Sequence, residues 1–136
     1  MSDKTIELTV VTPERQVFQD SVNMVIVQTL DGEMGVLPGH IPLVAPLDIG
    51  PMRIKTGEVE RRAAINGGFI EVTGSRVIVL SEAAEMAEEI DVARAKSARQ
   101  RAEARLEAQQ AEIDFARAQA ALKRALTRLK VAGHEG

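Results

Sequence analysis

Residues 90–131 contain neither glycine nor proline, and this uninterrupted stretch constrains the fold more than any other part of the chain. It is rich in alanine, arginine, glutamate and glutamine, which favour the α-helix. A single helix of this length would be roughly 63 Å long, at about 1.5 Å per residue. The apolar spacing weakens at residues 109–114, where Glu112 or Asp114 is suited to begin a second helix. The stretch therefore predicts either one rod or an antiparallel pair of helices.

Apolar residues recur at steps of three and four in each half of this stretch, as on one face of a helix. The first stripe is Ala95, Ala98, Ala102 and Leu106, and the second is Phe115, Ala118, Leu122, Leu126 and Leu129. Burying one methyl group stabilises a fold by only about 0.8 kcal/mol, so a seam made mostly of alanine is weak. This composition suits a hairpin that opens, and it equally suits a permanent antiparallel hairpin.

Charge is distributed unevenly along the chain. Residues 1–89 carry 7 basic and 14 acidic side chains, a net charge of −7, whereas residues 90–131 carry 10 basic and 5 acidic side chains, a net charge of +5. A basic arm on an acidic body predicts an acidic target, which is the body itself, nucleotide phosphates or an acidic partner. The simpler alternative is a solvated helix face with i,i+4 pairs, such as Arg99 with Glu103.

The composition argues against several classes of function. The chain has no cysteine, two histidines and no GxxxxGK[ST] phosphate loop, so we expect neither catalytic nor metal-binding residues. Its scarce aromatic residues and acidic body argue against nucleic-acid binding. No apolar run approaches the roughly 20 residues of a membrane-spanning helix, so we expect no direct membrane insertion and any membrane association to come through a partner.

Residues 1–80 predict β structure, because short apolar segments alternate with turn residues about every ten positions. The expected strands are residues 6–10, 17–18, 22–29, 41–47, 52–55, 59–65, 69–72 and 77–80. Residues 66–68 (NGG) are interpreted as a turn, and residues 31–40, with three glycines and a proline, as a tight loop that is either a docking surface or a simple bend. These strands predict a β-sandwich or a small barrel, and the shift to alanine and charge at residues 81–89 predicts a domain boundary there.

The loop at residues 31–40, the segment at residues 66–69 (NGGF) and the basic arm together resemble the epsilon subunits of bacterial rotary ATP synthases. The resemblance covers essentially the whole chain and implies an α+β fold, with an antiparallel β-sandwich at residues 1–84 and an antiparallel helical hairpin at residues 85–136. It implies a non-catalytic central-stalk subunit whose sandwich binds the gamma subunit and the membrane rotor ring of c subunits. It also implies a helical arm that either folds on the sandwich or extends along gamma, where it inhibits ATP hydrolysis. The implied location is peripheral, at the cytoplasmic face of the bacterial plasma membrane.

Residues 90–95 (IDVARA) resemble the I/L-D-x-x-R-A motif by which some of these subunits bind ATP as a regulatory ligand. The implied ATP-binding residues are Glu85, Ile90, Asp91, Arg94, Ala95, Arg101, Arg124 and Arg128. The implied rotor-ring contacts are Glu33, Gly39, His40 and Ile41, and the implied contacts of the extended arm with the catalytic beta subunits are Lys123, Arg124 and Arg128. The alternative for the motif is structural, with Asp91 capping a helix and Arg94 pairing with it.

Two other functions remain open from the residues alone. One is a non-catalytic β-sandwich adaptor whose arm dimerises as a coiled coil. The other is a nucleotide-hydrolysing enzyme, which the missing phosphate loop and missing catalytic base disfavour.

Overall fold

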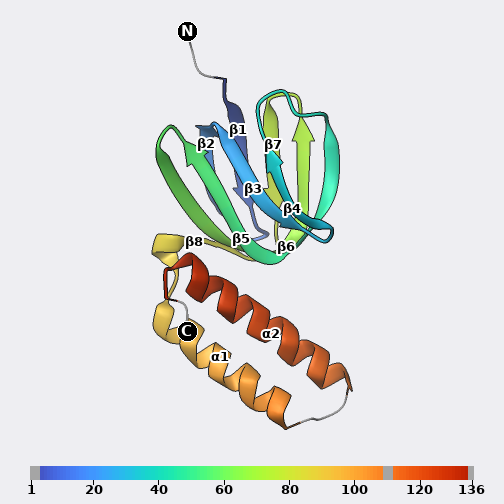
Figure 1. Cartoon of the computed structure of the whole chain (residues 1–136), viewed down its shortest axis with the longest axis vertical. Helices are drawn as coiled ribbons and strands as arrows, with labels where there is room; N and C mark the ends of the chain where they lie inside the picture. Colours follow the sequence, from blue (N-terminus) through green and yellow to red (C-terminus); the bar gives the residue numbers. More distant parts are fainter. Residues whose placement is uncertain (1–3, 109–111, 135–136) are drawn as a thin grey trace.

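The computed structural model describes residues 4–108 and 112–134, which form a β-sandwich followed by two packed helices (Figure 1). This confirms the predicted α+β class. The strands are β1 Ile6–Val11, β2 Gln16–Val22, β3 Met24–Thr29, β4 Gly32–Val36, β5 Leu43–Thr56, β6 Val59–Thr73, β7 Arg76–Leu80 and β8 Ala84–Met86. A short 3₁₀ helix, η1 (Ala87–Glu89), leads from the sandwich to helices α1 (Val92–Glu107) and α2 (Glu112–Val131).

The two layers of the sandwich are parts of one continuous sheet, in the order β2-β1-β7-β6-β5-β3-β4, with β8 paired to β6. Strands β5 and β6 are long enough to cross from one layer to the other. Their residues 43–46 and 69–73 lie in the layer with β7, β1 and β2, and their residues 49–56 and 59–66 lie with β3, β4 and β8. The strand pairs are antiparallel except β1 with β7, which is parallel and departs from the prediction.

The core lies between the layers and is filled by alternate residues of the strands. Leu8, Met52, Ile54 and Ile70 are among the side chains that are fully buried there. Burying each such side chain stabilises the fold by about 1.5–3 kcal/mol, which supports a sandwich that holds together independently of the helices.

Two turns expected from the sequence are strand in the structure. The predicted loop at residues 31–40 is half strand, since β4 pairs with β3 across a turn at residues 30–31, and only residues 38–39 form a second turn. Residues 66–68 lie within β6 and do not reverse the chain. The positive φ angles of Gly67 and Gly68, 70° and 103°, bend β6 instead, so the strands expected on either side are one continuous strand.

The arm has the geometry of two helices, with α2 lying between α1 and the sandwich (Figure 1). The predicted interruption falls partly on residues 109–111, which lie outside the described residues. Ala95, Ala102, Ala118 and Leu129 are buried as predicted. Phe115 and Leu126 are exposed, so the second stripe was partly wrong.

The buried face of α2 accounts for this difference. Its side chains toward α1 and the sandwich follow Ala118, Leu122, Ala125 and Leu129, at steps of four, three and four. This register turns Leu126 outward beside Ala125. The expected i,i+4 pair on α1 is present, with Arg99 Nε 3.2 Å from Glu103 Oε2.

Candidate functional site

A pocket of about 170 Å³ lies where the sandwich meets both helices. Strand β8 contributes Glu85, helix α2 contributes Arg128, and helix α1 contributes the rest of the lining. The α1 residues and the α1 N-cap in this lining are Asp91, Arg94, Ala95, Ala98 and Arg101. Six of the eight ATP-binding residues implied by the resemblance therefore line one pocket. Ala98 was not among them, although its spacing of three from Ala95 places it on the same helix face.

Asp91 is held at the start of α1 by its capping role. It has an extended backbone conformation, and its Oδ1 accepts a hydrogen bond from the backbone N–H of Arg94 at 3.1 Å. Asp91 therefore does cap α1, which was the structural alternative to a ligand-binding role for the motif. A carboxylate has two oxygens and about four acceptor positions, so capping leaves it able to accept from a ligand as well.

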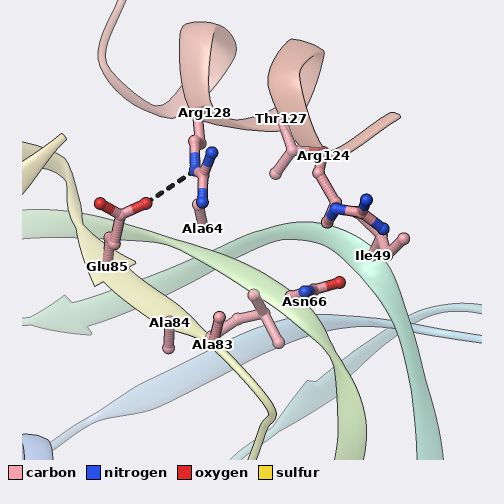
Figure 2. Close-up of a pocket in the computed structure, with 10 residues that line it drawn as sticks. Ile49, Ala64, Asn66, Ala83, Ala84, Glu85, Arg124, Thr127 and Arg128 are labelled. Atoms are coloured by element: carbon pink, nitrogen blue, oxygen red, sulfur yellow. Dashed lines mark hydrogen bonds and ion pairs between the residues drawn. The ribbon is translucent and has the colours of Figure 1, made fainter. Parts of the chain in front are cut away.

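The pocket contains one ion pair between the sandwich and α2. Arg128 Nε lies 2.7 Å from Glu85 Oε1, and both side chains are half-buried (Figure 2). With Arg94 and Arg101 on α1, three guanidinium groups surround this space. Guanidinium groups bind phosphate oxygens through paired N–H donors, so the pocket is suited to an anion that competes with Glu85 for Arg128.

Ile90 and Arg124 lie outside this pocket. Ile90 is buried against Ala64 and Val131, where it fastens the start of the arm to the sandwich. Arg124 lines an adjoining cavity of about 20 Å³ with Ile49 and residues of β6, and Figure 2 shows its guanidinium beside Ile49 and Asn66. That volume has room for about one water molecule.

Glu85 and Arg128 line both spaces and so form the wall between them. Arg124 is one helical turn from Arg128, so the sequence indicates that both lie on one face of α2. Which of the two reaches the motif depends on how α2 is rotated against the sandwich, and the sequence does not determine that rotation.

Lys123 also contacts the sandwich. Its Nζ lies 2.6 Å from Asp48 Oδ2, and this hydrogen bond is the main reason that the pKa of Asp48 lies below its ordinary value. All three cations implied to contact a partner from the extended arm, Lys123, Arg124 and Arg128, therefore lie against the chain's own body when the arm is folded.

The implied rotor-ring residues divide between the two ends of β4. Glu33 is the second residue of the strand, where its Oε2 accepts from Gln28 Nε2 at 3.2 Å. Gly39, His40 and Ile41 follow the other end, with Ile41 strongly exposed and His40 Nδ1 2.8 Å from the carbonyl oxygen of Ile41.

An apolar groove of about 680 Å³ on the sandwich was not expected from the sequence. Exposed Phe69 of β6 and Leu80 of β7 are register partners in it, and Val11 and Pro13 lie beside them. The available signal was the alternation of strand residues, which turns Phe69 and Leu80 away from the core that buries Ile70 and Val79. An exposed apolar surface of this kind is typical of a protein-binding site.

In the described parts of the arm and sandwich, no helix combines the length and apolar character needed to cross a membrane. Within residues 4–108 and 112–134, no group of three or more histidine or acidic side chains is arranged to hold a metal ion.

Family models match almost the whole chain. Residues 5–87 match the "ATP synthase, Delta/Epsilon chain, beta-sandwich domain", and residues 88–133 match the "ATP synthase, Delta/Epsilon chain, long alpha-helix domain". Among curated relatives, the ATP synthase epsilon chain of Anoxybacillus flavithermus is 55% identical over 107 residues, which are 79% of this chain and 80% of that protein. The epsilon chain of Brevibacillus brevis is 52% identical over 112 residues, 82% of this chain and 83% of that protein.

Two solved structures also contain chains that resemble this one. A chain in the cryo-EM structure of the OSCP/F1/c-ring part of the Euglena gracilis mitochondrial ATP synthase matches with a TM-score of 0.81 and 28% identity, covering 96% of this chain and 82% of that one. A chain in the central stalk/c-ring structure of the Tetrahymena thermophila mitochondrial ATP synthase has the same fold, with a TM-score of 0.62 and 11% identity, over 97% and 99% of the two chains. The chain therefore belongs to the family of ATP synthase epsilon chains, which are non-catalytic subunits of that complex.

Proposed function

We propose that this epsilon chain regulates and couples a bacterial ATP synthase through two positions of its helical arm. The sandwich binds the gamma subunit and the c-subunit rotor ring in the central stalk, at the cytoplasmic face of the plasma membrane. The folded arm binds ATP as a regulatory ligand, and the extended arm inhibits ATP hydrolysis by the catalytic beta subunits.

The observation that carries this proposal is that the pocket is lined by residues from the sandwich, from α1 and from α2. Glu85 belongs to the sandwich, Asp91 and Arg94 to the start of α1, and Arg128 to α2. These groups converge only when α1 packs on α2 and α2 packs on the sandwich. A ligand that needs all of them binds the folded arm alone.

The lining has the chemistry that a nucleoside triphosphate needs. Arg94, Arg101 and Arg128 offer guanidinium donors for phosphate oxygens. The carboxylate of Asp91 can accept a hydrogen bond from the exocyclic amino group of adenine, and Ala95 and Ala98 leave space beside it for a ring.

The energetics of binding are sufficient for a switch. A ligand that binds only one conformation, at about a hundred times its dissociation constant, stabilises that conformation by about 2.7 kcal/mol. The apolar cluster that fastens the arm to the sandwich is small, with Ala64, Ile90 and Val131 at its centre. Ligand binding on that scale therefore changes which arm position predominates.

The extended arm frees the cations that the folded arm engages. Lys123 leaves Asp48, and Arg128 leaves Glu85, so both become available to acidic side chains of the catalytic beta subunits. A coiled-coil dimerisation arm would need the alanine seam that α1 and α2 already bury against each other, which favours the regulatory function over the adaptor.

The sandwich offers two different surfaces for its two partners. We assign the rotor ring to the β4 region that carries Glu33, Gly39, His40 and Ile41, as the resemblance implies. The apolar groove of Phe69 and Leu80 is then the surface suited to the gamma subunit, because burying large apolar side chains stabilises a lasting interface.

Calorimetric titration of the purified chain with ATP tests the nucleotide site. Arg94→Ala removes one phosphate donor, and we expect affinity to fall by about ten-fold or more, the loss of a charge-assisted hydrogen bond. Asp91→Ser separates the two roles of Asp91, because serine caps a helix nearly as well but lacks the carboxylate. We expect Asp91→Ser to keep its helix content and lose ATP affinity.

The matched control is Arg105→Ala, which removes an exposed cation of α1 outside the pocket lining. Its affinity should stay within about two-fold of the unsubstituted chain, the range expected for distant surface charge. Unchanged binding in both pocket variants would remove the ATP assignment.

A further inference from the structure

Helix α2 is fastened to the sandwich by an ion pair that lies outside the nucleotide pocket. Lys123 Nζ is 2.6 Å from Asp48 Oδ2, five residues along α2 from the pair between Arg128 and Glu85. Asp48 and Lys123 line a separate groove of about 330 Å³ between α2 and strands β3 and β5. Neither residue is part of the pocket lining, so the two fastenings are physically distinct.

Asp48 is presented to α2 by the place where β5 crosses between layers. The regular pairing of β5 with β6 joins Leu47 to Gly68 and Ile49 to Asn66, and Asp48 lies between these two pairs. Its Oδ1 accepts a hydrogen bond from the backbone N–H of Ile49 at 2.8 Å, which leaves Oδ2 directed at Lys123. The carboxylate is thus held in position by the backbone before the arm arrives.

We propose that Asp48 acts as an internal acceptor that competes with the acidic partner surface for Lys123 and so sets the fraction of folded arm in the absence of nucleotide. The inference rests on the proposed function for the existence of an extended position. One ammonium group cannot occupy both sites, because extension carries α2 away from β5. Each carboxylate on the partner must therefore displace Asp48 before it binds Lys123.

The Asp48–Lys123 contact is strong enough to shift the ratio of folded to extended arm, but it is too weak to hold the arm permanently folded. Both side chains are partly exposed, at 50% for Lys123 and 36% for Asp48, so the pair is screened by water. Removing a pair of this kind changes an equilibrium constant by about three-fold. The apparent affinity of a ligand that binds only the folded arm falls by the same factor when the folded state is the minor one.

The test measures the folded fraction of the isolated chain without nucleotide. The natural sequence has no cysteine, so the exposed positions Glu58 and Gln119 can be changed to cysteine for a pair of distance labels, one on the sandwich and one on α2. Asp48→Asn retains the acceptor for the N–H of Ile49 and removes the charge. We expect Asp48→Asn and Lys123→Gln each to raise the ratio of extended to folded arm by about three-fold.

The exchange Asp48→Lys with Lys123→Asp restores an opposite-charge pair and should recover most of the folded fraction. The matched control is Lys130→Gln, which removes an exposed cation from the same groove and should leave the distribution unchanged. The inference would be overturned if Asp48→Asn left the ratio of extended to folded arm unchanged. It would also be overturned if the exchange variant had as much extended arm as the single variants.

Adding ATP to the same samples separates this inference from the proposed function. We expect the ATP affinity of Asp48→Asn to fall in proportion to its loss of folded fraction, by up to about three-fold, with the pocket intact. If the unsubstituted chain does not bind ATP but Asp48→Asn still opens the arm, the nucleotide site fails and the internal acceptor stands. If ATP binds but Asp48→Asn leaves the nucleotide-free distribution unchanged, the role of Asp48 as internal acceptor is refuted and the nucleotide site stands.

Discussion

Gly68 occupies a position in β6 that has no room for a side chain. Its φ angle is +103°, and a Cβ atom there would collide with the carbonyl oxygen of Leu80 and lie 2.8 Å from the Cα of Ser81. The close approach of β6 to the end of β7 therefore depends on this residue. Gly68 pairs with Leu47 of β5, the residue that precedes Asp48.

We expect Gly68→Ala to lower the free energy of unfolding by more than about 3 kcal/mol, because backbone strain and a backbone collision add together. Gly74→Ala is the control, since its φ of +57° carries the strain but no atom lies within 4 Å of the added Cβ. It should cost about 1–2 kcal/mol. Urea denaturation of both variants measures the difference, and equal losses would contradict the collision.

The sequence predicted most of the residues that line the pocket, but it did not predict how they are arranged. The spacing of Asp91, Arg94 and Ala95 places them on adjacent parts of the first helical turns, so a local rule was sufficient. Glu85 and Arg128 meet across 43 residues of sequence at 2.7 Å, and the resemblance alone brought them together. Arg124 points into the adjoining cavity because α2 is rotated by its contacts with the sandwich, a tertiary effect.

At the scale of elements, the connection between the sandwich and the arm is held to the sandwich at several points. Strand β8 pairs with β6, Arg15 binds Glu89 through two hydrogen bonds of 2.9 and 3.1 Å, and Arg61 Nη2 lies 2.8 Å from Glu88 Oε2. The arm therefore begins to be free only after Glu89. If the arm extends as proposed, Ile90 is the first residue after these contacts, and its packing against Ala64 and Val131 must then be broken.

These contacts predict a loss of stability in acid. Hydrogen bonds from Arg15 to Glu89 hold the pKa of Glu89 below its ordinary value of 4.5, and the pKa of Glu88 is lowered by a backbone hydrogen bond and by Arg61. A carboxyl group with a lowered pKa in the folded state stabilises that state fully above its ordinary pKa. The contribution is lost as the pH falls through the folded-state pKa.

We therefore expect the free energy of unfolding to be steady from neutral pH down to about 5 and to fall below it. Arg15→Gln should make this acid decline shallower, because Glu89 then keeps a pKa nearer its ordinary value. Urea denaturation at a series of pH values measures the slope. An identical slope in both proteins would show that the Arg15–Glu89 pair contributes nothing to acid sensitivity.

The strands show where sequence patterns are sufficient and where they are not. Apolar and β-branched segments between turn residues located every strand from β1 to β7 except β4, whose two glycines and single buried side chain, Val36, give no such signal. The expected breaks at residues 48–51 and 66–68 correspond to the bend at Gly67 and Gly68, where Asp48 is the one position between Leu47 and Ile49 with no register partner. Pairing between β5 and β6 carries both strands through them, which only the tertiary structure reveals.

At the scale of the whole molecule, the sandwich has its own core and the arm adds a thin contact to it. We expect truncation after Glu89 to leave a folded sandwich, because the cut retains β8 and the contacts of Arg15 and Arg61. Reassembled into an ATP synthase, this form should lose inhibition of ATP hydrolysis while still joining the complex. Circular dichroism and hydrolysis rates of the reassembled enzyme measure the two outcomes, and undiminished inhibition would mean that the arm is not the inhibitor.

Strands β5 and β6 belong to both layers of the sandwich, joined by one backbone ladder from Leu43 with Val72 to Thr56 with Val59. Torque applied to one layer is therefore transmitted to the other through the peptide bonds and ladder hydrogen bonds of β5 and β6. Transmission does not rely on side-chain packing between the layers. If the sandwich binds the gamma subunit and the rotor ring as proposed, the torsional stiffness between these two partners depends on the β5–β6 hairpin. The proposed extension of the arm would leave this ladder intact, because α1 and α2 contribute no strand to it.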